Sequence, residues 1–143
     1  MTYRQNIVWH DPVTLYSNII ASGEAAVKAH TNLGSYYTQQ GDFQKASAEY
    51  AIAVQNSGDT VAGLQHDMGV NLMMANGGAL NDEALTHLRR ALVINPDYFP
   101  TLKLLADYYA AEGKSAEAAP YQSHVDALRR HYKTISDTQP LQP

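Results

Sequence analysis

Histidines are the residues whose chemistry first suggests a function, since the chain has six and neutral imidazole is a common metal ligand. Their spacing argues against a metal site. His124 and His131 lie two helical turns apart, too far to bind one ion as neighbours, and no HExxH pair or cysteine completes a ligand set. His30 falls in an apolar stripe, and both His30 and His66 are interpreted as neutral and hydrogen-bonded or solvated. We expect no metal and no cofactor.

Catalytic motifs are missing from the sequence as well. There is no nucleophile elbow and no spaced pair of carboxylates for acid and base catalysis. The Asn76-Gly77-Gly78 run is interpreted as a connecting turn, because a phosphate-binding loop would follow a strand and no strand is expected. Most of the ten tyrosines fall at positions that recur along the chain with a period of about 34 residues, which favours a role in packing over the stacking of nucleic-acid bases. We therefore expect the chain not to be an enzyme.

The charge balance disfavours nucleic acid as a partner. Lys and Arg total 10 against 14 for Asp and Glu, which gives a formal charge of −4, whereas nucleic-acid affinity comes largely from neutralised phosphates. The nearest basic cluster, Arg129, Arg130 and Lys133, is flanked by Asp126 and Asp137 and is interpreted as a solvated helix face. A protein or a peptide is the expected partner.

The compartment stays open at this level. The chain has no cysteine, so its redox environment cannot be inferred. No apolar run approaches the length that spans a bilayer, and Met1 to His10 lack the order of a signal peptide, so we expect no direct membrane insertion.

The elements that carry these side chains recur with a period of about 34 residues, and such a period is typical of stacked helical hairpins. In 143 residues, three copies can be aligned. The first contains Leu33, Gly34, Tyr37, Gly41, Phe43, Ala46, Tyr50, Ala53 and Val54; the second Met68, Gly69, Leu72, Ala84, Leu88, Ala91, Leu92 and Pro96; the third Leu102, Leu105, Ala106, Tyr109, Gly113 and Ala118. An unrelated helical bundle would explain each helix but not this shared register.

These residues and their spacing resemble the tetratricopeptide repeat (TPR) family. The resemblance implies an all-α fold, a right-handed solenoid of antiparallel helix hairpins with a C-terminal capping helix. We divide the chain into a partial repeat with an N-terminal helix (1–26), a first repeat (27–60), a second repeat with three extra residues in its turn (61–98), a third repeat with the capping helix (99–135) and a disordered tail (136–143).

Two places depart from the repeat pattern. Pro120 falls inside the expected second helix of the third copy, so this helix is predicted to begin late or to be kinked there. At the other end, Tyr3 and Trp9 align with Tyr37 and Phe43, as if the chain opened partway through a repeat. Asp11-Pro12 then provides a cap and a first-turn proline for a helix over roughly 13–22.

TPR proteins hold peptides on the concave surface lined by the first helix of each hairpin. Alignment of the three copies with the family's repeat positions implies a peptide-binding groove in this chain. Its residues would be Lys28, Thr31, Asn32, Ser35, Thr38 and Gln39 from the first copy, His66, Val70, Met73 and Met74 from the second, and Lys103, Asp107 and Ala110 from the third. Met73 and Met74 fit a surface for apolar segments, although one of them is equally well explained as core. The family's clamp for C-terminal carboxylates is missing, because Thr31, Ser35, Asp67, Pro100 and Leu104 occupy its positions.

A second resemblance concerns about the first forty residues. It rests on Tyr3-Arg4-Gln5-Asn6, Trp9-His10-Asp11, Thr14-Leu15-Tyr16, Lys28-Ala29-His30 and Asn32-Leu33-Gly34. This run is similar to the start of the TPR tail in membrane glycosyltransferase-like proteins, although Tyr16 replaces the usual Trp. It implies an accessory domain on the extracytoplasmic side of a bacterial membrane that recruits acceptor proteins. A general interaction module or scaffold in the cytoplasm is the other hypothesis, and homo-oligomerisation through Ile7 and Trp9 is a third.

Overall fold

The computed structural model describes residues 11–22 and 26–138, and their side chains as far as Thr134. These residues form seven α-helices and no strand, which confirms the predicted all-α class. The helices are α2 (Pro12–Ala21), α3 (Ala26–Gln39), α4 (Phe43–Asn56), α5 (Ala62–Ala75), α6 (Asp82–Ile94), α7 (Phe99–Ala111) and α8 (Ser115–Thr138).

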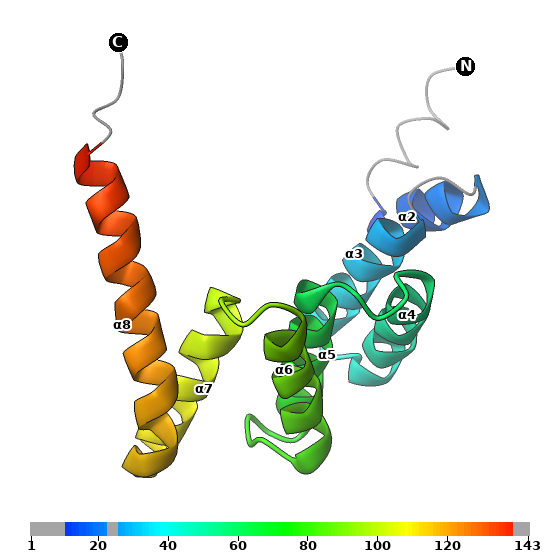
Figure 1. The fold of residues 1–143 in the computed structure, drawn as a ribbon. Coiled ribbons are helices and arrows are strands. Elements are labelled where there is room, and N and C mark those ends of the chain that lie inside the picture. The colour runs from blue at the N-terminus through cyan, green and yellow to red at the C-terminus, as the bar shows by residue number, and fades with distance from the viewer. Residues whose placement is uncertain (1–10, 23–25, 139–143) are drawn as a thin grey trace. The chain divides into compact units, whose positions relative to one another are not determined.

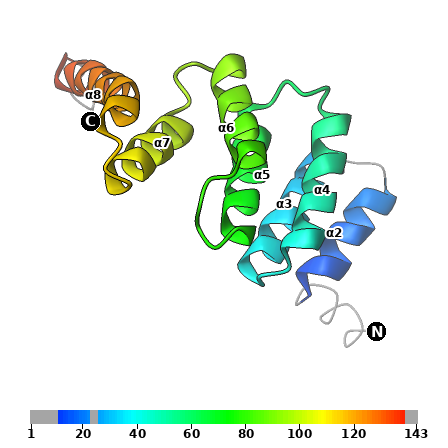
Figure 2. The same ribbon diagram turned by 90° about the horizontal axis from the view of Figure 1, so that it is seen from below.

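The chain divides into two compact units, Met1–Ile94 and Asn95–Pro143. In the first unit, α3 and α4 form one antiparallel hairpin and α5 and α6 form the next, while α2 packs against α3 and α4 packs against α5 (Figures 1 and 2). In the second unit, α7 and α8 form a hairpin of the same kind. Each hairpin thus buries its apolar stripe between its two helices and, in the first unit, against the neighbouring hairpin.

Two glycines of the repeat pattern allow the helices of each hairpin in the first unit to approach closely. A Cβ atom built on Gly34 would lie 2.7 Å from the ring of Tyr50, and one built on Gly69 would lie 2.7 Å from Cγ of Leu88. Tyr50 and Leu88 are both buried at the centre of their hairpins. The two glycines are therefore required by packing, since any side chain there would separate the helices.

The helix ends follow local chemistry. The Asp11 carboxylate accepts hydrogen bonds from the amides of Val13 and Thr14, as predicted for the cap of the first helix. Gly41 and Gly113 take positive φ angles of 77° and 71° in the tight turns inside the first and third hairpins. The turn of the second hairpin, residues 76–81, is longer by three residues than the turn 40–42.

The last helix differs from the prediction. We expected a late start or a kink at Pro120, but α8 begins at Ser115 and includes Pro120, so the late start is wrong. Pro120 is the sixth residue of α8, so its missing N–H removes one backbone hydrogen bond, and the helix is formed on both sides of it. Helix α8 also continues to Thr138, so residues 136–138, which we assigned to the tail, are helical.

Some predictions concern residues outside the described ranges. The alignment of Tyr3 and Trp9 with the repeat and the uncovered apolar side chains of Ile7 and Trp9 belong to residues 1–10. The prediction of a disordered tail, as far as it concerns residues 139–143, lies outside them too.

Candidate functional site

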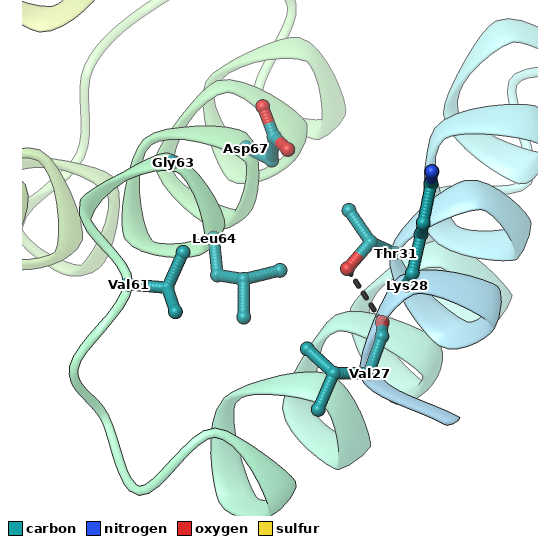
Figure 3. A pocket seen from close by; sticks show the side chains of 7 residues that line it. All are labelled: Val27, Lys28, Thr31, Val61, Gly63, Leu64 and Asp67. Carbon is teal, nitrogen blue, oxygen red and sulfur yellow. Dashed lines mark hydrogen bonds between the residues drawn. The ribbon is translucent and has the colours of Figure 1, made fainter. Parts of the chain in front are cut away.

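A pocket of about 420 Å³ opens between the first helices of two successive hairpins. Helix α3 forms one wall, and the start of α5 with the residue before it forms the other (Figure 3). It is lined by Val27, Lys28, Thr31, Val61, Gly63, Leu64 and Asp67. The pocket lies entirely within the first unit.

The walls of this α3/α5 pocket are mainly apolar. Val27 and Val61 face each other across the opening, with Leu64 between them (Figure 3). Leu64 is only 3% exposed, whereas Val61 is 43% exposed, so Leu64 forms the floor and Val61 an accessible rim. The Thr31 hydroxyl donates to the carbonyl oxygen of Val27 at 2.7 Å, so its one hydrogen-bond donor is used within α3.

Asp67 is the acidic group of the α3/α5 pocket. Within the described part of the chain, its carboxylate accepts no hydrogen bond and forms no ion pair. Burial raises the pKa of Asp67 to about 6, because a partly desolvated carboxylate resists ionisation. Burial also raises the pKa of Tyr50, and the negative charge of Asp67 adds to that rise, so the two side chains lie in one electrostatic environment.

The unpaired carboxylate of Asp67 is expected to reduce stability at neutral pH. The pKa of Asp67 in the folded chain lies above its ordinary value of 3.8, so the folded state binds the proton more tightly and stability falls as pH rises through about 4 to 6. We therefore expect Asp67→Asn to raise the free energy of unfolding by about 1–2 kcal/mol at pH 7.5, after allowing for partial solvation. Urea titrations should show that gain shrinking at pH 4; an equal gain at both pH values would contradict this electrostatic origin.

A second, smaller pocket of about 240 Å³ lies between α2 and α3. It is lined by Tyr16, Ile19, Lys28, Ala29 and Asn32. Thr31 and Asn32, which were assigned to one groove, therefore line different pockets. Lys28 lines both, Thr31 lines only the α3/α5 pocket, and Asn32 lines only the pocket on the α2 side.

The remaining predicted groove residues of α3 lie toward its C-terminal half. Ser35 and Thr38 are half-buried, and their side chains lower the pKa of Tyr50 in part, against the larger rise caused by burial. The Thr38 hydroxyl also lies 2.9 Å from Oδ1 of Asn71, so much of its bonding capacity is used inside the protein. Gln39 is exposed at the last position of α3.

On α5, the predicted groove residues share one helix but differ in exposure. His66, Val70 and Met73 are half-buried, and Met74 is 44% exposed. Burial lowers the pKa of His66, which favours a neutral imidazole. None of the four lines the α3/α5 pocket.

Lys103 and Asp107 lie in the second unit, on α7. Both are exposed, and Nζ of Lys103 lies 2.5 Å from Oδ2 of Asp107. Each therefore has a partner of opposite charge on its own helix, one turn away. Ala110 is exposed on the same helix.

The prediction by register missed most of the pocket walls. Val27, Val61, Gly63 and Leu64 were not included, and Asp67 was considered only as a position of the missing carboxylate clamp. A sequence signal existed, because Val61 and Leu64, like Leu64 and Asp67, are three residues apart and share one helix face. The signal was weak because Val61 precedes the first helical residue of α5.

The described residues contain no group of three or more His, Cys, Asp or Glu side chains placed to hold a metal ion. In the same ranges, every helix is too short or too polar to cross a lipid bilayer.

Comparison with known proteins gives matches in structure only. No protein-family model matches the chain, and no curated protein matches it in sequence. Solved structures of MamA, a TPR-like helical protein, do match. One crystal structure of MamA has a TM-score of 0.61 and 19% identity, over 76% of this chain and 60% of that one. MamA AMB-1 has a TM-score of 0.62 at 20% identity (89% and 67% of the two chains), and MamA MSR-1 0.62 at 21% identity (90% and 71%).

The chain has a TPR-like helical fold. At these identities the likeness concerns the fold alone, and it agrees with the hairpins and the helix-contact glycines described above. The chain spans only 60–71% of the length of these three structures.

Proposed function

We propose that this chain is a non-catalytic protein-protein interaction module that binds a peptide segment of a partner protein in the α3/α5 pocket. The observation that carries the proposal is the position of that pocket between the first helices of two successive hairpins, α3 and α5. In the TPR pattern these helices line the ligand surface. Lys28 and Thr31, assigned to the groove by register, both line the pocket.

The size and chemistry of the pocket suit peptide side chains. Its volume of about 420 Å³ lies at the small end of the range for ligand sites. Val27, Val61 and Leu64 offer apolar surface, and a partner side chain that covers it gains roughly 25 cal/mol for each Å² removed from water. An exposed rim at Val61 leaves the pocket accessible.

The bound segment is proposed to continue from the pocket along α5. Met73 and Met74 lie two to three turns beyond Leu64 on that helix, and Met74 is exposed. Flexible thioether side chains adapt to different apolar partners. Asn32 would contribute on the α2 side of α3, and Lys103, Asp107 and Ala110 are proposed as a separate contact surface on α7, within the second unit. No structural observation favours the accessory-domain hypothesis as a second candidate, since much of the run that suggested it belongs to residues 1–10.

Val61→Asn separates binding from stability. Val61 is the N-cap residue of α5 and makes no side-chain capping hydrogen bond, and Asn is among the best residues there. We expect the change to raise the free energy of unfolding by about 0.5–1 kcal/mol. The same change removes an apolar rim from the pocket, so peptide affinity should fall about fivefold to tenfold.

The measurement uses peptides selected from a random library on the full chain, with affinities determined by titration calorimetry. The matched control is Val93→Asn, because Val93 is 68% exposed on α6 and does not line the pocket. We expect the control to leave peptide affinity unchanged. If selected peptides bind both variants as tightly as they bind the unmodified chain, the pocket is not the binding site.

A further inference from the structure

Asp67 and Lys28 are the two charged residues that line the α3/α5 pocket, and they come from opposite walls. Among the described residues they form no ion pair with each other, although several exposed pairs occur elsewhere in the chain. An ionised carboxylate beside apolar walls is costly unless a donor meets it. The pocket therefore contains an acidic group without a partner of its own.

The position of Lys28 leaves that acidic group available. Lys28 is exposed, and its side chain extends along α3 rather than across to Asp67 (Figure 3). Burial is the cause of the raised pKa of Asp67, whereas a nearby ammonium group would lower it. Lys28 thus does not neutralise Asp67 in the unliganded protein.

We infer that the α3/α5 pocket selects an arginine side chain of the bound segment, with the Asp67 carboxylate as its acceptor. The inference rests on the proposed function and adds the chemistry of the ligand. It follows from charge complementarity, since the pocket offers one unpaired negative group among apolar walls. An acidic or purely apolar side chain would leave Asp67 desolvated and unmatched.

Arginine fits both parts of the pocket. Its three methylene groups can lie against Val27, Val61 and Leu64, as long cationic side chains commonly do on apolar surfaces. Its guanidinium group can donate two parallel hydrogen bonds to one carboxylate. It is also less strongly hydrated than an ammonium group, so its transfer into a partly desolvated pocket costs less than that of lysine.

Binding of arginine should depend on pH through Asp67. The pKa of Asp67 is about 6 in the unliganded chain, so only a small share of the carboxylate is ionised at pH 5. A cation prefers the ionised form, and affinity should therefore be about tenfold weaker at pH 5 than at pH 7.5.

Of the other titratable groups near Asp67, His66 is the one whose charge would change binding in the same direction. From α3, Lys28 lines the pocket, and from α4, Tyr50 lies within reach of the charge of Asp67. Burial raises the pKa of Tyr50, so its phenol stays neutral between pH 5 and pH 7.5. His66 is the neighbour of Asp67 on α5, and burial lowers its pKa. If protonated at low pH, His66 would repel a cation, so it would weaken binding there just as protonation of Asp67 does. From α6, the His87 side chain contacts Gln65 instead, with 2.6 Å between Nδ1 of His87 and Oε1 of Gln65. Asp67→Asn keeps His66 and Lys28, so comparison with the unmodified chain isolates the contribution of Asp67 to the pH dependence of binding.

The test selects short peptides from one random library on the unmodified chain and on Asp67→Asn in parallel. Asp82→Asn serves as matched control, because Asp82 is exposed on α6 outside the pocket. We expect arginine to recur at one position in peptides selected by the unmodified chain and by Asp82→Asn, but not by Asp67→Asn. For one such peptide, Asp67→Asn and replacement of its arginine by citrulline should each weaken binding about tenfold, and the two changes together little more. The difference between pH 5 and pH 7.5 should largely vanish in Asp67→Asn.

Two results would overturn the inference in distinguishable ways. Peptides that lose affinity for Val61→Asn but show no arginine preference and bind Asp67→Asn equally well would refute the arginine pocket and leave the proposed function standing. Failure to select any peptide that depends on Val61 would refute both.

Discussion

We expect Asn71→Ala to lower the free energy of unfolding of the chain by about 3–4 kcal/mol. Asn71 is 0% exposed and lies on α5. Its Nδ2 donates to the carbonyl oxygen of Phe43 at 3.1 Å and to the Ser47 hydroxyl at 2.8 Å, and its Oδ1 accepts from the Thr38 hydroxyl at 2.9 Å. Since a carbonyl oxygen can only accept, the orientation of the amide is fixed by its contact with Phe43.

The size of this effect follows from what the truncation leaves behind. Asn71 connects α5 to α3 through Thr38 and to α4 through Phe43 and Ser47. Alanine removes all three part-buried hydrogen bonds, each worth about 1 kcal/mol, and leaves a space that the fully buried side chain had filled. Packing between the two hairpins of the first unit should weaken most.

Chemical denaturation monitored by circular dichroism measures this loss. Asn56→Ala is the matched control, because Asn56 is exposed at the end of α4 and should change stability by less than about 0.5 kcal/mol. If Asn71→Ala proved as stable as the control, Asn71 would not be the polar connection that holds α5 against the first hairpin.

Gly69→Val should destabilise the chain by about 3 kcal/mol or more. A Cβ at this position would lie 2.7 Å from Cγ of Leu88 and 3.0 Å from the carbonyl oxygen of Ala84, so α5 and α6 would have to separate. The conflict with backbone at Ala84 cannot be relieved by a rotamer change alone. Helix propensity acts in the opposite direction, since Gly is about 0.5 kcal/mol or more less favourable in a helix than Val.

A double variant tests the physical cause. In a Leu88→Ala background the largest contact is removed, so Gly69→Val should cost clearly less than it does in the unmodified chain. The coupling energy obtained from the four denaturation curves should be about 1–2 kcal/mol in favour of the double variant. Strictly additive losses would mean that Leu88 is not what excludes a side chain at position 69.

Periodic packing could be predicted from the sequence, and Gly34, Tyr50, Gly69 and Leu88 show why. Their spacing recurs because every hairpin has the same helix contact, so one copy predicts the next. Turn glycines such as Gly41 were predictable for the same reason, since the turn requires a positive φ.

Features that differ between the copies were not predictable. Asn71 has a polar side chain and would be assigned to the surface, yet it is buried because three partners converge on it. Thr38, assigned to the groove by register, bonds to this same amide. For Pro120 the sequence left two outcomes open, a late helix start or a kink, and local sequence alone did not exclude the late start that the structure contradicts.

The pocket itself escaped prediction because it depends on how far apart α3 and α5 lie, and local sequence does not encode this distance. Val61 lies just before α5 and so outside the repeat positions that were compared. Asp67 was identified only as a position where the carboxylate clamp is missing. Its role became visible when the structure placed it among the residues that line the same cavity as Val27 and Leu64.

The most direct test of the central claim is methyl NMR of the full chain during titration with a selected peptide. Binding in the α3/α5 pocket should shift the methyl signals of Val27, Val61 and Leu64, while the exposed Val93 on α6 and Ile52 on α4 should stay unchanged. Peptide binding that shifts Val93 or Ile52 and leaves the three pocket signals in place would contradict the account.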